Sequence, residues 1–194
     1  SSTPSAERSI GMRRWRLKTY RRTGMDLSQP DRDMGKVHPV VRQRWFALLP
    51  DLEAMLGCHV LMNEGYRSDE RQGWLYGAGR TRDVLDKLGV NPDWARPTEL
   101  RVTNAWTARL SAHGWMVNGV PASAALDVVP LGADGKPWTT DDPWGKFVML
   151  TTDTGILAAK HGLVHFHAAG KMVWDRPHIQ AVEWSDARHQ LEGL

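Results

Sequence analysis

The helical and extended segments of this chain do not alternate regularly, and this order constrains the fold more than any other feature. Residues 38–57 carry apolar side chains at intervals of three and four, which predicts an amphipathic helix that ends at Gly57. Pro50 predicts a kink or the start of a second helix. Further helices are predicted over 69–76, 82–89, 142–162 and 185–194, and extended segments over 58–64, 100–106, 122–131, 163–168 and 178–184. A doubly wound sheet needs regular alternation, so we predict a single α+β domain with a small antiparallel sheet flanked by helices.

The size and composition indicate a globular domain that folds without covalent cross-links. The chain has 194 residues, of which 41% are hydrophobic and 24% charged. Cys58 is the only cysteine, which excludes an internal disulfide and a thiolate zinc finger. No apolar run approaches the roughly 20 residues of a membrane helix. No apolar signal-peptide segment is recognised near residue 1, so we expect synthesis in the cytoplasm.

Residues 1–36 are predicted to form a basic arm, and residues 37–194 the folded domain. Seven lysine and arginine residues lie between Arg8 and Arg22, and Glu7 is the only acid before Asp26. Such an arm can bind an anionic polymer such as nucleic acid, lipopolysaccharide or wall phosphate. The alternative is a solvated, partly disordered tail. A nucleic-acid role would rest on the arm alone, and we do not expect one.

A carboxylate inside an apolar strand is the first candidate for chemistry. Asp127 lies between Leu126 and Val128, and a buried carboxylate needs a partner. His113 precedes the intervening Gly/Pro-rich loop, and imidazole and carboxylate groups both ligate zinc. The two residues are therefore candidates for a metal site. In the alternative interpretation, Asp127 faces solvent on an edge strand or forms a hydrogen bond with a turn.

A second candidate pair lies near the C-terminus. If residues 178–184 form a strand, His178 points away from the Ile179 face, and Asp175 reaches in from the preceding turn. A carboxylate so placed can take a proton from metal-bound water. An ordinary turn aspartate and a half-buried strand histidine are the alternative. His165 and His167 share one strand face, either as a metal pair or as polar residues.

Arg67 is a further candidate, because it follows a predicted strand and precedes a predicted helix. A guanidinium in that position can clamp a carboxylate or polarise a carbonyl. With Arg67, four short motifs occur in one order: Gly-Tyr-Arg-Ser at 65–68, Ser-Ala-His at 111–113, Ala-Leu-Asp at 125–127 and Asp-Arg-Pro-His at 175–178. In this order they resemble the VanY-like zinc peptidoglycan peptidases. That group includes D-Ala-D-Ala carboxypeptidases and phage endolysins that cut L-Ala-D-Glu bonds. The resemblance spans roughly residues 38–183.

The resemblance implies one Zn²⁺ per chain, bound by His113, Asp127 and His178. It implies that Asp175 is the general base and then the acid, and that Arg67 stabilises the scissile carbonyl as it becomes an oxyanion. The residues expected to contact substrate are Arg67, Gln72, Ser111, His165 and His167. The implied fold is the compact α+β domain of the D-Ala-D-Ala peptidase and hedgehog type, whose antiparallel sheet carries the ligands.

The sequence departs from the family pattern in two places. The family has six residues between the first histidine and the aspartate, whereas His113 and Asp127 are separated by an insertion of about seven more, which a loop can absorb. The Trp-Gly-Gly-like step before the last motif is replaced by His-Phe-His-Ala-Ala-Gly. His165 or His167 is therefore expected to line the cleft as a substrate contact or as a second proton donor.

These observations predict a zinc metallopeptidase of peptidoglycan stem peptides, first of all an endolysin-type L-Ala-D-Glu endopeptidase of a phage or prophage. A D-Ala-D-Ala carboxypeptidase of the same fold is the first alternative. A non-catalytic wall-binding or virion structural module is the second, since the ten tryptophans of the chain could stack on sugars or peptides. We expect peptidoglycan as the partner, with the arm on an anionic envelope polymer. We also expect a monomer that acts at the cell wall or periplasm of a bacterial host.

Overall fold

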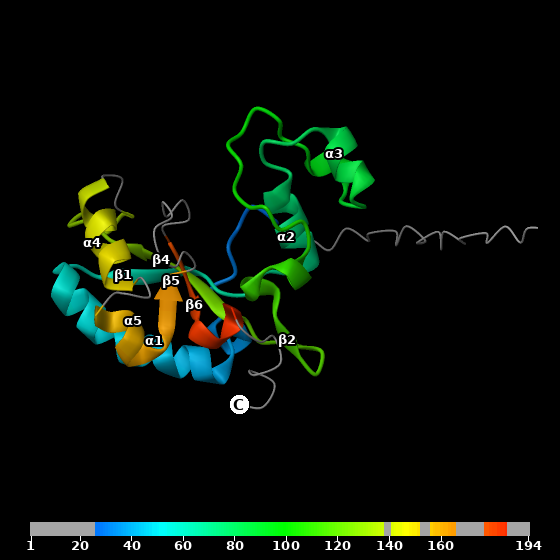
Figure 1. Cartoon of the computed structure of the whole chain (residues 1–194). Helices are drawn as coiled ribbons and strands as arrows, with labels where there is room; N and C mark the ends of the chain where they lie inside the picture. Colours follow the sequence, from blue (N-terminus) through cyan, green and yellow to red (C-terminus); the bar gives the residue numbers. More distant parts are fainter. Residues whose placement is uncertain (1–25, 138–140, 152–155, 166–176, 186–194) are drawn as a thin grey trace, which may run out of the picture.

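The structure is a computed structural model that describes residues 26–137, 141–151, 156–165 and 177–185. A small sheet lies at the centre, with a layer of helices on one side and a long excursion on the other (Figure 1). The predicted α+β class with an antiparallel sheet is confirmed. Within the described ranges, no helix is both long enough and apolar enough to cross a membrane.

The central sheet is antiparallel throughout, and its strand order differs from the order along the chain. The order is β1-β4-β6-β5, so β4 and β6 have a neighbour on both sides. The four strands are β1 Val60–Glu64, β4 Ala125–Pro130, β5 Leu163–His165 and β6 His178–Ala181. Because β6 is buried along its whole length, polar side chains on it must find partners inside the protein.

Three helices cover one face of the sheet: α1 Pro39–Leu56, α4 Asp141–Thr151 and α5 Ile156–His161. The left-handed backbone at Gly57, with φ 74°, ends α1 as predicted. The helix continues through the exposed Pro50, so the alternative of a second helix is wrong. Leu48 and Leu52, on either side of Pro50, are fully buried and hold this part of α1 against the core.

Several predicted boundaries change in the folded chain. The single helix predicted over 142–162 is assigned as α4 and α5, and residues 152–155 between them lie outside the described part. The strand predicted over 178–184 ends at Ala181, and the 3-10 helix η5 follows over Val182–Ser185. The helix predicted over 185–194 lies outside the described residues apart from its first position.

A long excursion follows α2 Asp69–Tyr76 and carries α3 Arg82–Lys87. Its extended stretch over 100–106 forms no strand, because its carbonyls serve side chains instead. The buried Arg80 donates to the carbonyl of Thr103 at 2.7 Å and stacks 3.6 Å from the ring centroid of Tyr76. The excursion thereby closes back on α2, as Figure 1 shows at the upper right.

The described end of the predicted arm, residues 26–36, packs against the end of β1. The carbonyl of Asp31 accepts the backbone N–H of Gly65 at 2.8 Å. Arg32 donates to the backbone carbonyl and side-chain oxygen of Asn63 at 3.2 and 3.0 Å. This segment therefore supports the turn after β1. Residues 1–25, which hold the basic cluster, lie outside the described residues.

Candidate metal centre

Glu64, Asp127 and His178 form a row across three adjacent strands. Glu64 of β1 lies opposite Asp127 of β4, which lies opposite His178 of β6. A register shift between Met62 and Glu64 marks a bulge, which brings Glu64 rather than Asn63 opposite Asp127. Directly opposed residues project to the same face of a sheet, so three polar side chains gather away from the helical layer.

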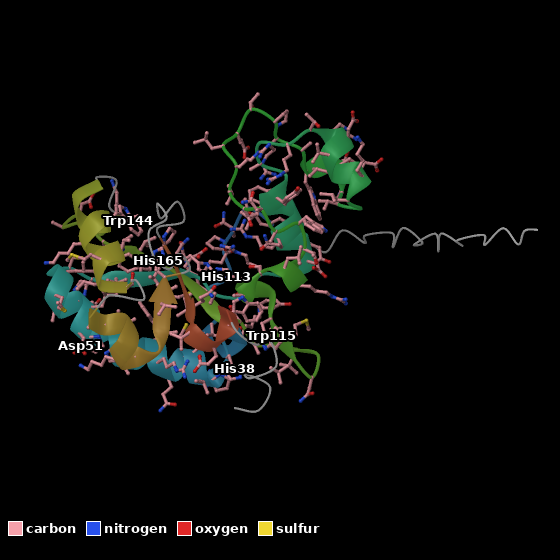
Figure 2. All side chains as sticks on the ribbon, in the orientation of Figure 1. His38, Asp51, His113, Trp115, Trp144 and His165 are labelled. Carbon is pink, nitrogen blue, oxygen red and sulfur yellow. The ribbon has the colours of Figure 1, made fainter. Side chains whose placement is uncertain are left out.

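His113 approaches this row from outside the sheet. It lies in the short 3-10 helix η4, Ala112–Gly114, where the hydroxyl of Ser111 accepts the backbone N–H of His113 at 3.3 Å. The backbone carbonyl of His113 accepts the N–H of Arg67 at 3.1 Å. These bonds fix η4 beside the turn after β1, so the imidazole of His113 points toward the row. Figure 2 shows His113 between the sheet and the excursion.

The insertion between His113 and Asp127 folds as a β-hairpin. Its strands are β2 Met116–Val117 and β3 Val120–Pro121, and its turn residues Asn118 and Gly119 have φ of 50° and 79°. Positive φ at both turn positions is the hairpin geometry that an Asn-Gly pair favours. The N–H of Ala122 donates to the carbonyl of Trp115 at 2.9 Å and closes the base of the hairpin. The extra residues therefore leave His113 and Asp127 close in space.

Three ligand-type atoms of these residues converge. Nε2 of His113 lies 3.1 Å from both Oδ1 of Asp127 and Nδ1 of His178, and those two atoms are 3.5 Å apart. The exposed fractions of His113, Asp127 and His178 are 1%, 8% and 8%. Corners of a tetrahedron with zinc-type bonds of about 2.0–2.1 Å are about 3.3–3.4 Å apart. The separations in this group are close to that spacing.

The opposite nitrogen of each imidazole has its own hydrogen-bond partner. Nδ1 of His113 lies 2.6 Å from the carbonyl oxygen of Gly65, which can only accept, so Nδ1 carries the proton in this bond. Nε2 of His178 lies 3.0 Å from the amide oxygen of Gln180 and donates to it. Neutral rings in these tautomers direct two nitrogen lone pairs at Asp127, so the group needs a cation or a shared proton between its members.

A buried charge network adjoins the group. Nη2 of Arg67 donates to Oδ2 of Asp127, and Nε of Arg67 donates to Glu64 at 2.8 Å. Nε of Arg71 donates to the other oxygen of Glu64 at 2.7 Å, and its Nη1 donates to the carbonyl of Leu27 at 2.6 Å. The two guanidinium groups and two carboxylates thus compensate one another's charge through direct ion pairs.

This environment shifts the pKa values of two group members. Burial, followed by the positive charge of Arg67, lowers the pKa of His113 and keeps its imidazole neutral. Burial alone would raise the pKa of Asp127, but Arg67 and His113 hold it well below its ordinary value. Because protonation is disfavoured at both residues, a metal cation is the better charge to place between them. The buried His113-Asp127-His178 group could hold a metal ion.

The structure separates the other predicted site residues into three sets. Arg67 adjoins the group, and Ser111 caps the 3-10 helix that carries His113. Gln72 is fully buried on α2 and donates to Thr103 Oγ1 at 3.1 Å and to the carbonyl of Ala105 at 2.8 Å, so it ties α2 to the excursion. Asp175 and His167 lie outside the described residues.

His165 does not join the group. It lies opposite Ile179 of β6, whose side chain belongs to the core face of the sheet, whereas His178 projects to the other face. The ring of His165 packs edge-on with its centroid 6.1 Å from that of Phe147 of α4, and 1% of the residue is exposed. A direct contact with substrate does not fit this position, because Phe147 and the sheet enclose the side chain.

Sequence reasoning missed three residues of the polar network: Glu64, Arg71 and Gln180. Glu64 is a carboxylate at the end of a predicted strand, but the sequence pattern does not show the bulge that aligns it with Asp127. Gln180 shares a strand face with His178 by alternation alone. Arg71 looked like any charge on an amphipathic helix.

Comparison with protein-family models and with curated proteins finds no relative of this chain. No protein-family model matches the chain, and no curated protein matches it. The functional assignment therefore rests on the residues of the group and their geometry.

Proposed function

We propose that the chain is a zinc metallopeptidase that hydrolyses peptide bonds in peptidoglycan stem peptides, with the D-Ala-D-Ala peptidase type of fold. The observation that carries the proposal is the convergence of His113, Asp127 and His178, three residues from three of the motifs that the sequence shares with those peptidases. Two histidines and one carboxylate, with a position left for water, form a donor set typical of catalytic zinc. The zinc ion would supply Lewis acidity and lower the pKa of its bound water to about 7.

The residues of the chain then have separate tasks. His113, Asp127 and His178 would hold the ion, while Arg67 donates a hydrogen bond to Oδ2 of Asp127 and so fixes the orientation of this carboxylate. Asp175, three positions before His178, is proposed as the base that accepts the proton from the attacking water and returns it to the leaving amine.

Charge supports this assignment. The described charged side chains at the centre are Glu64, Arg67, Arg71 and Asp127, whose formal charges add to zero. A divalent ion added to them leaves a net positive centre among buried groups. Such a centre favours an oxyanion over a neutral carbonyl, which is the difference that accelerates peptide hydrolysis.

We further propose peptidoglycan as the partner and the bacterial cell wall as the place of action, with the basic arm on an anionic envelope polymer. An L-Ala-D-Glu endopeptidase is the first candidate, and a D-Ala-D-Ala carboxypeptidase uses the same centre. The non-catalytic wall-binding module stays as the outcome to be excluded.

The test combines metal analysis with digestion of purified peptidoglycan, followed by mass spectrometry. We expect about one zinc per chain. Release of free stem peptides identifies the endopeptidase, and loss of a single alanine identifies the carboxypeptidase. Asp175→Ala should keep the zinc and lose cleavage, whereas His178→Ala should lose both. Asp134→Ala, at an exposed turn, is the matched control. A wild-type protein that binds the wall but neither holds zinc nor cleaves with added zinc would favour the binding module.

A further inference from the structure

Gln180 is a buried amide beside a proposed metal ligand. It lies two residues after His178 on β6, so both side chains project to the same face of the sheet. Its amide oxygen lies 3.0 Å from Nε2 of His178, and 3% of the residue is exposed. Gln180 lies opposite Ala125 of β4, whose small side chain leaves room for the amide on this face.

This contact favours one ligand nitrogen of His178 over the other. A neutral imidazole carries one proton, and the nitrogen that bears it cannot bind a metal. An acceptor at Nε2 keeps the proton there and leaves the lone pair on Nδ1, the atom that lies 3.1 Å from Nε2 of His113. Without the acceptor, the proton can move to Nδ1 and point at Asp127, 3.5 Å away.

The two imidazoles are held in opposite tautomers by different kinds of acceptor. Nδ1 of His113 faces the backbone carbonyl of Gly65, which no substitution removes. Nε2 of His178 faces a side chain, which evolution or mutagenesis can change. Since Gln180 is buried, water has no ready access to replace it.

We propose that Gln180 is a positioning residue of the metal centre, which selects Nδ1 of His178 as the coordinating atom. The inference rests on the proposed metal site but not on the choice of substrate. Mutation of a partner that orients a metal-bound histidine typically lowers metal affinity or activity by about 10–100-fold. Gln180 would act in this way, through the tautomer and orientation of His178.

The test compares Gln180→Met, which removes the acceptor at similar volume, with Gln180→Glu, which keeps an acceptor oxygen. Zinc affinity is measured by competition with a chelator, and the tautomer of His178 by long-range ¹H–¹⁵N NMR of the metal-free full chain. We expect Gln180→Met to bind zinc about 10–100-fold more weakly and to populate the Nδ1–H tautomer, while Gln180→Glu binds as tightly as the wild type or more tightly.

Gln72→Met is the matched control, because Gln72 is an equally buried glutamine that contacts none of the three ligands. It should lose stability and keep zinc affinity, which separates positioning from packing. The proposal is overturned if Gln180→Met retains wild-type affinity, if His178 keeps its Nε2–H tautomer in that variant, or if the wild type binds no zinc. Failure of wall cleavage by a zinc-bound wild type would instead overturn only the proposed peptidase activity.

Discussion

Arg67 donates a hydrogen bond to Oδ2 of Asp127, while Oδ1 of the same carboxylate faces His113 and His178. The two oxygens of Asp127 are thus divided between a fixed guanidinium and the candidate metal position. Glu64 holds the other side of Arg67, so the orientation of a proposed ligand depends on a residue that does not touch the metal position. The candidate metal centre and the buried ion network therefore form one structural unit.

Glu64→Ala should strongly destabilise the protein, because Arg67 and Arg71 would each keep a buried charge without this partner. Removing one member of a buried ion pair costs about 3–5 kcal/mol in the free energy of unfolding. Glu99→Ala is the control, since the Arg96–Glu99 pair lies at the surface with 51% of the Glu99 side chain exposed. That change should cost less than about 1 kcal/mol. Urea denaturation of the metal-free protein measures both, and equal losses would show that the buried network contributes nothing special.

Zinc should raise the melting temperature of the wild type, because the folded state holds the ligands together and the unfolded chain does not. At a free zinc concentration 100 times the Kd, zinc binding should raise the free energy of unfolding by about 2.7 kcal/mol. His178→Ala should abolish most of the shift. His59→Ala should preserve it, because 88% of the His59 side chain is exposed and it lies away from the group. A shift that survives His178→Ala would mean that zinc binds elsewhere.

Acid should destabilise the metal-free protein through His113. The folded-state pKa of His113 lies below the ordinary 6.5, because burial and Arg67 disfavour the imidazolium. As the pH falls below 6.5, the unfolded chain takes up the proton first, and the free energy of unfolding decreases until the folded pKa is passed. Asp127 has a lowered pKa as well, and its stabilisation is lost only at still lower pH, through its folded pKa.

Denaturation between about pH 5 and 8 tests this effect when the wild type is compared with His113→Gln. The difference between the two proteins isolates His113 from the other histidines. We expect a shallower pH dependence in the variant, and parallel curves would contradict the assignment. The zinc affinity of the wild type should also decrease as the pH falls, because protons compete with the metal for the same lone pairs.

Shortening the β2–β3 hairpin should leave the metal centre intact. Replacing residues 116–121 by Asn-Gly joins Trp115 to Ala122 through a two-residue turn. We expect zinc affinity to change by no more than about threefold, since the free energy of loop closure varies slowly with length. Val120 is 63% exposed and Met116 44%, so little packing is lost. If zinc affinity, measured by competition with a chelator, fell tenfold or more, the hairpin would have a role in placing His113.

Gly65→Ala should disturb the centre through a steric contact. A Cβ at position 65 would lie 2.9 Å from Cγ2 of Val37, and the carbonyl of Gly65 is the acceptor for His113. We expect a destabilisation of about 1–3 kcal/mol from overpacking, together with weaker zinc binding. Adding Val37→Ala removes the contacting methyl groups, so the double variant should recover part of both losses. Strictly additive effects in this cycle would argue against the contact.

Some features of the tertiary structure could be predicted from the sequence, and others could not. Regular apolar spacing predicted α1 and its glycine stop, because a helix that buries one face repeats that face along the chain. The Asn-Gly pair at 118–119 is a sequence signal for a hairpin, and this hairpin keeps His113 and Asp127 close in space despite the insertion between them. Alternation could not assign His165, because the register with Ile179 places it on the core face.

The sequence by itself determined that the candidate ligands are two imidazoles, His113 and His178, and one carboxylate, Asp127. It also placed Asp127 inside an apolar strand. Only the tertiary structure decided that these residues meet, because the strand order β1-β4-β6-β5 and the bulge before Glu64 set the cross-strand neighbours. It also decided the partners of each ring nitrogen and of Asp127, through Gly65, Gln180 and Arg67. The chemistry of a side chain follows from its residue type, which the sequence gives directly. Strand register and hydrogen-bond partners depend instead on contacts between segments that are distant in the sequence.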